Sequence, residues 1–207
     1  MFPSLYNQYI AIDAYLQQLE KQKDPVPTQL RETKISGCYE LTLKVFTDVR
    51  GTFVKTFHEN IFQDYGLDTN FTEEYYSNSY NNVLRGLHFQ TPPRDHTKLV
   101  YCVFGEVMDV VVDLRVGSPT YGKFETFTLN SEKANLVYVP RGLAHGFYVT
   151  SDLAIMMYKV STVYSPENDA GLLWNSIGIP WKSENPIMSQ RDREFVKFAD
   201  FESPFVF

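Results

Sequence analysis

The stretch Asn82-Val-Leu-Arg-Gly-Leu-His-Phe-Gln90 alternates apolar with polar side chains, and a Pro92-Pro93 pair separates it from a second extended run that begins at Lys98. A period of two is typical of a β-strand, because successive side chains of an extended chain point to opposite faces. The Pro-Pro pair predicts a turn between the two runs. These residues therefore predict two neighbouring strands that carry an arginine, a histidine, a glutamine and a lysine.

The alternation also predicts which side chains of the first strand share a face. Arg85 and Leu87 are expected on one face. Gly86, His88 and Gln90 are expected on the other, in the interior of a sandwich or barrel. A buried histidine needs polar partners, because an unpaired polar group inside a protein is costly. Catalysis is one reason for such a histidine and a structural role is the other; Gln90 is expected to line the substrate site beside it.

The chain repeats this strand pattern from about residue 33 onward. Further strands are predicted at Cys38–Phe46, Phe53–Phe57, Val100–Phe104, Glu106–Leu114, Gly122–Leu129, Asn135–Val139, Phe147–Val149 and Ala154–Val160. Turn residues separate these segments, and most of them follow one another without an intervening helical pattern. Short strands at close spacing are typical of an antiparallel sandwich or closed barrel, so the fold class is predicted to be all-β.

Three segments have helical patterns instead. Apolar residues recur every three or four positions between residues 3 and 23, and a proline-containing segment ends the pattern. Short helices are also expected at Asn60–Tyr65 and from Gln190 onward. Residues 1–30 are thus predicted to form an amphipathic helical extension, and residues 31–207 a single domain.

The composition disfavours several classes of protein. The chain has 207 residues and a formal net charge of −6, which argues against nucleic acid as a partner. No segment approaches the roughly 18 consecutive apolar residues of a membrane helix, and the N-terminus lacks a signal-peptide pattern. Cys38 and Cys102 are expected to be buried free thiols. We therefore expect a cytoplasmic protein without a membrane partner.

His88 has neighbours that suit proton transfer at a carbon next to a carbonyl group. Lys98 follows it across the turn and can reach the same cavity, and Tyr158 lies on another predicted strand. A neutral imidazole can remove the proton, a cation can hold the enolate oxygen, and a phenol can return a proton to the opposite face. These side chains predict an acid–base site that inverts a carbon centre.

The segment Pro140-Arg-Gly-Leu-Ala-His145 resembles the second motif of cupins, many of which bind metal. In metal-binding cupins this histidine joins a His-x-His pair, but here Gln90 stands two positions after His88. Two histidines without a third nitrogen ligand match a zinc or iron site poorly. We therefore expect neither a metal nor another cofactor.

From about Thr33 to Arg193, roughly three quarters of the chain, the sequence resembles the dTDP-4-dehydrorhamnose 3,5-epimerase family, whose members are cupin jelly rolls. The resemblance is carried by Val83–Gln90, Pro92–Pro93, Lys98–Val100, Gly105–Val107, Val112–Arg115, Gly117–Pro119, Pro140–Phe147, Tyr158–Lys159, Tyr164–Glu167, Trp174–Asn175, Ile177–Trp181 and Ser189–Asp192. Such an ordered series is highly specific. It implies a jelly roll that acts on a sugar nucleotide.

The resemblance implies catalytic roles for five residues. His88 matches the family's base, and Asp192 matches the aspartate that orients its imidazole. Lys98 matches the lysine near the C4 carbonyl oxygen. Tyr158 matches the acid, and His145 matches a further histidine of the pocket.

The resemblance also implies substrate contacts and an assembly. Arg85 and Arg50 match arginines that contact the diphosphate, whose oxygens a guanidinium can bind bidentately. Arg50 and Phe53 would come from the partner subunit of a homodimer by strand exchange. Tyr164 matches an aromatic residue that packs on the base.

Three positions near the nucleotide depart from the family pattern. Lys55 stands where the family usually has glutamate, and Glu73 and Tyr75 stand where it usually has Gln-x-Asn. Lys55 and Glu73 are still expected to contact the substrate. Their changed charges suggest that the base differs from thymine; sequence drift or a shift of one residue in the alignment is the alternative.

These observations predict an epimerase that inverts C3, C5 or both in a nucleoside-diphosphate-4-keto-6-deoxyhexose, with dTDP-4-dehydro-6-deoxyglucose as the first candidate. One alternative is an epimerase for a single centre, or a 3,4-ketoisomerase, on a different sugar nucleotide. Another is a non-catalytic cupin that binds a sugar nucleotide. His88, Lys98 and Tyr158 disfavour the last alternative, because a site for binding alone needs neither an acid nor a base.

Overall fold

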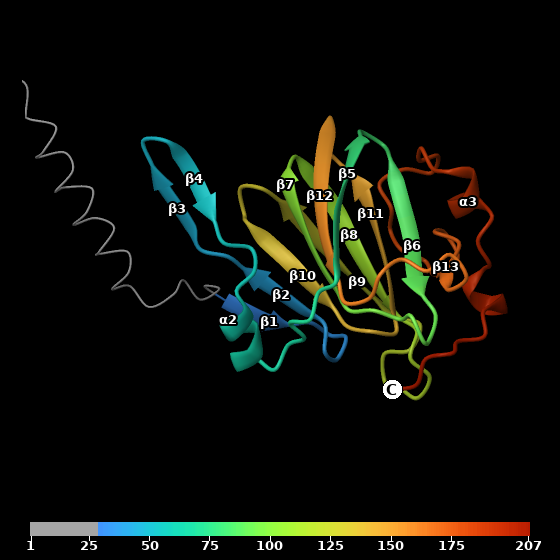
Figure 1. Ribbon diagram of the computed structural model, residues 1–207. Coiled ribbons are helices and arrows are strands. Elements are labelled where there is room, and N and C mark those ends of the chain that lie inside the picture. The colour runs from blue at the N-terminus through green and yellow to red at the C-terminus, as the bar shows by residue number, and fades with distance from the viewer. Residues whose placement is uncertain (1–28) are drawn as a thin grey trace, which may run out of the picture.

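The computed structural model describes residues 29–207, which form two antiparallel β-sheets and a separate hairpin (Figure 1). The six-stranded sheet has the order β1 (Gln29–Glu32), β2 (Tyr39–Thr42), β10 (Asn135–Val139), β7 (Lys98–Phe104), β12 (Leu153–Val160) and β5 (Glu73–Tyr80). The five-stranded sheet has the order β13 (Asp169–Gly171), β6 (Leu84–Gln90), β11 (Leu143–Val149), β8 (Glu106–Asp113) and β9 (Phe124–Asn130). The remaining elements are the hairpin strands β3 (Val45–Asp48) and β4 (Gly51–Val54), the helices α2 (Glu59–Asp64) and α3 (Gln190–Arg193), and the 3-10 helix η1 (Phe198–Asp200).

The prediction of a mainly β fold is confirmed, and the two short helices expected after residue 31 are also present. The helix expected between residues 3 and 23 lies outside the described residues. The prediction of one continuous strand at Cys38–Phe46 is wrong. The chain leaves the six-stranded sheet after Thr42, because β10 begins opposite that residue and offers no further partner. Strand β5 was not predicted, because its residues EEYYSNSY do not alternate between apolar and polar side chains.

Apolar side chains from both sheets meet in a packed layer between them. Val100 and Met156 enter this layer from the six-stranded sheet, and Val111 enters it from the five-stranded sheet. Cys38 and Cys102 also lie in the layer as buried free thiols, as predicted. Burial of apolar area in this layer contributes about 25 cal/mol per Å² to the stability of the sandwich.

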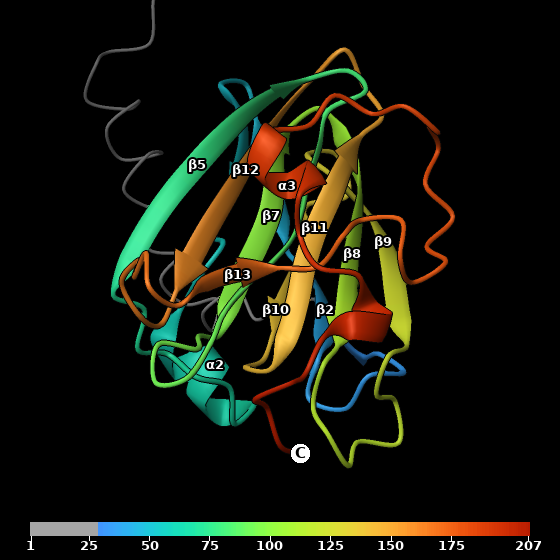
Figure 2. The same ribbon diagram turned by 90° about the vertical axis from the view of Figure 1, so that its right-hand side faces the viewer.

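Each sheet is also covered on its outer face. Helix α2 places Phe62 against the six-stranded sheet, in a second apolar cluster that includes Leu99 and Leu136. The C-terminal segment places Phe201 and Phe205 against the five-stranded sheet. Figure 2 shows this segment, coloured red, on the side of the molecule where β13 and β11 lie. Parts of both sheets therefore carry apolar side chains on the inner and on the outer face.

The pairing of β6 with β11 contains a β-bulge. His145 pairs with His88, but Phe147 pairs with Arg85, so two residues of β6 stand opposite the single residue Gly146. A bulge of this kind changes which side chains point to a given face.

The bulge makes the predicted orientation of Arg85 wrong. Strict alternation placed Arg85 with Leu87 and opposite to His88. In the structure Arg85 and His88 both line the same cavity, and Leu87 packs in the outer apolar cluster. The extra residue reverses the alternation between Arg85 and His88, so Arg85 lies on the inner face together with His88.

Gly86 occupies a position in the bulge that admits no side chain. A Cβ added at Gly86 would lie 2.6 Å from the Cα atom of Gly146, and the φ angle of Gly86 is +137°. Its N–H donates a hydrogen bond of 3.1 Å to Oδ2 of Asp192. The backbone at Gly86 therefore links the strand to a carboxylate that is far away in the sequence.

The hairpin formed by β3 and β4 extends away from the two sheets (Figure 1). Val49 at its tip is fully exposed, and Phe53 is 61% exposed. Within residues 29–207, no helix reaches the length and apolarity that a membrane span requires.

We predict that Gly86→Ala destabilises the protein more than Gly178→Ala. Both glycines have positive φ, but only at Gly86 would the added methyl group meet backbone atoms. At Gly178, backbone strain alone is expected to lower the free energy of unfolding by about 1–2 kcal/mol. At Gly86, the clash with the Gly146 backbone should lower it by about 1–3 kcal/mol more. Urea unfolding of the two variants measures the difference, and equal losses would contradict the role given to the close strand contact.

Candidate active site

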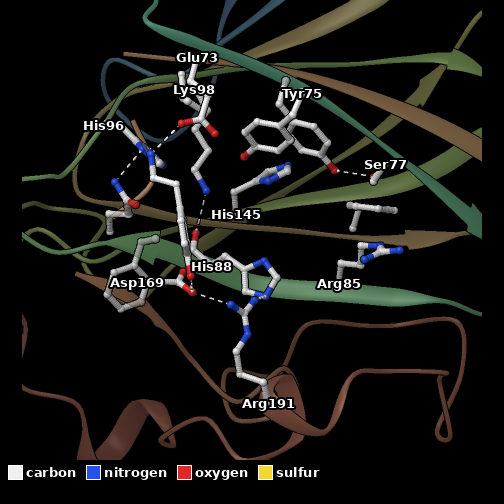
Figure 3. A pocket seen from close by; sticks show the side chains of 16 residues that line it. Glu73, Tyr75, Ser77, Arg85, His88, His96, Lys98, His145, Asp169 and Arg191 are labelled. Carbon is white, nitrogen blue, oxygen red and sulfur yellow. Dashed lines mark hydrogen bonds and ion pairs between the residues drawn. The ribbon is translucent and has the colours of Figure 1, made fainter. Parts of the chain in front are cut away.

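A cavity of about 370 Å³ lies between the sheets and is lined mainly by polar side chains (Figure 3). Its lining consists of Glu73, Tyr75, Ser77, Arg85, His88, Phe89, Gln90, His96, Lys98, His145, Phe147, Tyr158, Val160, Tyr164, Asp169 and Arg191. The structure brings most of the site residues predicted from the sequence together in this cavity. They are His88, Lys98, His145, Tyr158, Arg85, Gln90, Glu73 and Tyr164, and Asp192 contacts His88.

His88 on β6 forms a close pair with Asp192 on α3. Nε2 of His88 lies 2.9 Å from Oδ2 of Asp192, whose side chain is almost completely buried. The Gly86 N–H donates to the same carboxylate oxygen, and Ser189 caps α3 by accepting the Asp192 N–H. The carboxylate is therefore held in one position, and it holds the imidazole in turn.

Burial and neighbouring charges set the ionisation of this pair. Burial lowers the pKa of His88 below its ordinary value of 6.5; Asp192 opposes the shift, and the cations Lys98 and Arg191 add to it. Burial would raise the pKa of Asp192, but hydrogen bonds from His88 and Gly86 outweigh it and hold that pKa well below the usual range. At neutral pH the pair is thus an imidazole beside a carboxylate.

Asp192, rather than Arg191, determines which nitrogen of His88 is available as a base. One guanidinium NH2 group of Arg191 lies 3.1 Å from Nε2 of His88, and its Nε lies 3.2 Å from Oδ1 of Asp192. Nε2 cannot donate to Asp192 and also accept from Arg191. Because the carboxylate can only accept, we assign the proton to Nε2. Nδ1 then carries the free lone pair, and no hydrogen bond within residues 29–207 reaches it.

Tyr158 stands on the opposite wall of the cavity. His88 belongs to β6 of the five-stranded sheet, whereas Tyr158 belongs to β12 of the six-stranded sheet. The Tyr158 hydroxyl lies 3.3 Å from Oγ of Ser77, and its ring stacks on Tyr75 with centroids 4.8 Å apart. Burial raises the pKa of the Tyr158 phenol, so the hydroxyl keeps its proton at neutral pH. The cavity thus has a base on one wall and a proton donor on the other.

Lys98 joins the two walls. Its side chain comes from β7 of the six-stranded sheet, and Nζ donates a hydrogen bond of 3.1 Å to the backbone oxygen of His88. Burial lowers the pKa of the Lys98 ammonium to about 8, although Asp169 and Asp109 favour the charged form. This ammonium is a positive charge that solvent screens only weakly.

His145 lies beside His88 and has a carboxylate of its own. The two histidines are direct partners in the pairing of β6 with β11. Nε2 of His145 lies 2.7 Å from Oδ2 of Asp109, and both side chains are buried. Burial raises the pKa of Asp109, and His145 acts against that shift. The His145 ring also contacts the edge of Tyr158 at a centroid distance of 6.2 Å.

A loop after β12 closes one side of the cavity and is held by two side chains of the predicted site. Oε2 of Glu73 accepts the backbone N–H of Tyr164 at 2.7 Å. Oε1 of Gln90 accepts the N–H of Ser165 at 2.7 Å, and Nε2 of Gln90 donates to the backbone oxygen of Arg94 at 2.7 Å. The Gln90 amide is therefore used to hold loops, although its side chain lies in the cavity wall.

Arg50, Phe53 and Lys55 are not in the cavity lining of the single chain. Arg50 lies at the tip of the hairpin, where it forms an ion pair with Asp48, and Phe53 packs against Phe46 of the paired strand. Arg50 and Phe53 thus lie on the hairpin, and Lys55 follows its last residue, so all three lie away from the cavity of this chain.

The structure adds residues that the sequence analysis did not select. Asp109 pairs with His145, and Asp169 pairs with Arg191. Each pair joins residues far apart in the sequence, so no local pattern indicated it. Ser77 lies on β5, whose strand character was missed, and Tyr75 on the same strand had been named only as a departure from the family pattern. Arg191 precedes Asp192 directly, and this adjacency is the one local feature that could have revealed it.

Within residues 29–207, no group of three or more His, Cys, Asp or Glu side chains is arranged to hold a metal ion. The side chains that converge in the cavity are instead an imidazole, an ammonium and a phenol on facing walls. The fold and the site together define a jelly-roll protein of the cupin type with ionisable side chains on facing walls of one cavity.

A model of the family described as dTDP-4-dehydrorhamnose 3,5-epimerase matches residues 32–200, and the chain belongs to this family. The dTDP-4-dehydrorhamnose 3,5-epimerase of Shigella flexneri is 43% identical over 172 residues, which are 82% of this chain and 95% of that protein. The dTDP-4-dehydrorhamnose 3-epimerase of Streptomyces niveus is 37% identical over 175 residues, 83% of this chain and 84% of that protein.

A similar solved structure is the dTDP-6-deoxy-D-glucose-3,5-epimerase of Legionella pneumophila Philadelphia 1 in complex with dTDP-4-keto-L-rhamnose. It matches with a TM-score of 0.81 and 32% identity, and the match covers 84% of this chain and 94% of that chain.

We predict that the pKa of His88 lies below 6.5 and responds to its two charged neighbours in opposite directions. Asp192→Asn should lower it further, because a stabilising negative charge is lost, and Arg191→Gln should raise it, because a repelling positive charge is lost. NMR titration of the four histidines measures the shifts, with His88→Ala to assign the signal.

The matched control for this titration is Arg193→Gln on the same helix. The Arg193 guanidinium donates to the backbone oxygen of Pro186 instead of approaching His88, so its loss should leave the His88 pKa unchanged. The account of this pair fails if Arg191→Gln lowers the pKa of His88.

Proposed function

We propose that the protein inverts C3 and C5 of dTDP-4-keto-6-deoxyglucose, to give dTDP-4-keto-L-rhamnose. The observation that carries the proposal is the placement of His88 and Tyr158 on opposite walls of one cavity, since inversion needs proton removal on one face and proton return on the other. The relatives named above support the substrate, because the Shigella and Streptomyces proteins are named for dTDP-4-dehydrorhamnose and the Legionella protein was solved with dTDP-4-keto-L-rhamnose.

The proposed reaction begins at Nδ1 of His88. This nitrogen takes the proton from the carbon next to the C4 carbonyl, and the electron pair of the C–H bond moves into an enolate. Asp192 stabilises the resulting imidazolium through Nε2. Tyr158 then gives its hydroxyl proton to the opposite face of the same carbon. Solvent resets the protons of both residues, so each centre is inverted without net consumption of an acid or a base.

Lys98 is proposed to stabilise the negative charge that develops on the C4 oxygen. Its side chain is buried and reaches from the sheet of Tyr158 to the backbone oxygen of His88, which holds the ammonium. A fixed cation in a poorly solvated cavity stabilises an enolate more than a solvated cation would. His145, fixed by Asp109, supplies a second polar group beside it.

The diphosphate is assigned to Arg85 and Arg191, which both line the cavity. Nε of Arg85 donates to Oγ of Ser79 at 2.9 Å, so the guanidinium is oriented before the substrate arrives. The Arg191 side chain is 51% exposed and reaches the cavity beside His88. Guanidinium groups suit this role because their planar donors match phosphate oxygens.

A second candidate function is inversion at C3 alone. The Streptomyces niveus relative, named as a 3-epimerase, favours this alternative. NMR analysis of the product separates the two, because each inverted centre changes the coupling constants of its ring proton.

We also propose a homodimer in which the hairpin of one subunit completes the site of the other. Val49 and Phe53 on the hairpin are exposed apolar residues, and such residues on a projecting element are typical of an interface. Arg50 and Phe53 of the partner would then lie near the nucleotide.

Deuterium exchange in D2O tests the chemistry. His88→Ala is expected to abolish both exchange at C3 and C5 and product formation, because it removes the base. Tyr158→Phe is expected to lower inversion by about 10²–10⁴-fold and to retain exchange, because His88 can still remove protons. Tyr121→Phe, outside the cavity lining, is the control for loss of a phenol. Absence of exchange in the wild-type protein with this substrate would refute the proposed function.

Mixing two inactive variants tests the exchanged hairpin. An Arg50→Glu chain and a His88→Ala chain should form heterodimers in which one site has both native residues. Random assembly makes half of the dimers mixed, so about a quarter of the wild-type activity should return. Activity that does not exceed the sum of the separate variants would place Arg50 outside the partner's site.

A further inference from the structure

Edge strand β5 presents Tyr75 and Ser77 to the cavity from the same face of the strand. Tyr75 is the direct cross-strand partner of Tyr158, and Ser77 stands opposite Met156, two residues along β12. Both side chains line the cavity. Tyr76 between them is 68% exposed and is absent from that lining. Two neighbouring positions of β5 therefore contact the same phenol from the same side.

The ring of Tyr75 covers the ring of Tyr158. The two rings are nearly parallel, with an angle of 17° and centroids 4.8 Å apart. Tyr158 is 6% exposed, whereas Tyr75 is 41% exposed, so Tyr75 lies on the solvent side of the pair. An aromatic cross-strand pair of this kind stabilises the arrangement of its two rings beyond the effect of the area that it buries. This contact restricts the rotation of Tyr158 about its side-chain torsions.

Ser77 fixes the other end of the Tyr158 side chain. Its Oγ lies 3.3 Å from the Tyr158 hydroxyl. When Tyr158 has given up its proton, the Ser77 hydroxyl can donate to the phenolate and stabilise it. This hydrogen bond lowers the pKa of Tyr158 and so acts against the larger effect of burial. The stack thus sets the plane of the ring, and the hydrogen bond sets the position of its oxygen.

We propose that Tyr75 and Ser77 are positioning residues for the proton donor Tyr158, and that together they determine how often an enolate is protonated on the inverting face. This inference rests on the proposed function. An enolate has two fates in the cavity: a proton from Tyr158 inverts the centre, and a proton returned by His88 restores it. The His88 side chain is 26% exposed, so its proton can exchange with solvent before it returns. Failed inversion is therefore visible as deuterium in unchanged substrate.

The experiment measures, in D2O, the ratio of inversion to deuterium exchange at C3 and at C5 by NMR. Tyr75→Ala and Ser77→Ala should each lower this ratio, by roughly ten- to a hundredfold for the loss of the stack. The exchange rate itself should change little, because His88 and Asp192 lie on the other wall. Tyr75→Phe keeps the aromatic pair and should restore the ratio.

Tyr76→Ala is the matched control, since it removes a tyrosine from the outward face of the same strand. A merely structural effect of the cavity variants would reduce exchange and inversion together and leave their ratio unchanged. That result in both Tyr75→Ala and Ser77→Ala would overturn the inference, even though wild-type inversion would still support the proposed function. If Tyr75→Ala does not fold, Ser77→Ala decides the question, because it removes only one hydroxyl group.

Discussion

The close contact between β6 and β11 at Gly86 and Gly146 is the constraint on which the site depends. A Cβ at Gly86 would lie 2.6 Å from the Gly146 Cα, and a Cβ at Gly146 would lie 2.9 Å from the Arg85 carbonyl oxygen. The bulge at this contact turns both Arg85 and His88 into the cavity. It also directs the Gly86 N–H to Asp192. Backbone geometry therefore assembles the imidazole and its carboxylate, and a side chain at either glycine would separate the strands.

Burial in the cavity has opposite consequences for its acidic and basic groups, because it disfavours the charged form of each. It lowers the pKa of His88 and raises that of Tyr158, so one group stays neutral and able to accept a proton while the other stays neutral and able to donate one. Lys98 keeps its charge near neutral pH because Asp169 and Asp109 partly offset its burial. The sandwich thus provides the protonation states that an enolate mechanism requires.

The sequence analysis succeeded where a property depends on residues close together in the chain. Alternation located β6, β7 and β12, and with them the strands that carry His88, Lys98 and Tyr158. It failed at Arg85, because a bulge depends on the partner strand and leaves no mark on the period of its own strand. It also missed β5, because this edge strand is largely exposed and its residues EEYYSNSY do not alternate between apolar and polar side chains.

By itself the sequence determined the all-β class, the residue types of the acid–base site and the family resemblance, because these follow from local periodicity and from motifs in a fixed order. The tertiary structure alone decided which side chains face one another. The pairing of β5 with β12 brings Tyr75 and Ser77 to Tyr158, and the packing of α3 on β6 brings Asp192 to His88. Such contacts join residues that are far apart in the chain, and only the packing of the two sheets and the C-terminal segment fixes the distances between them.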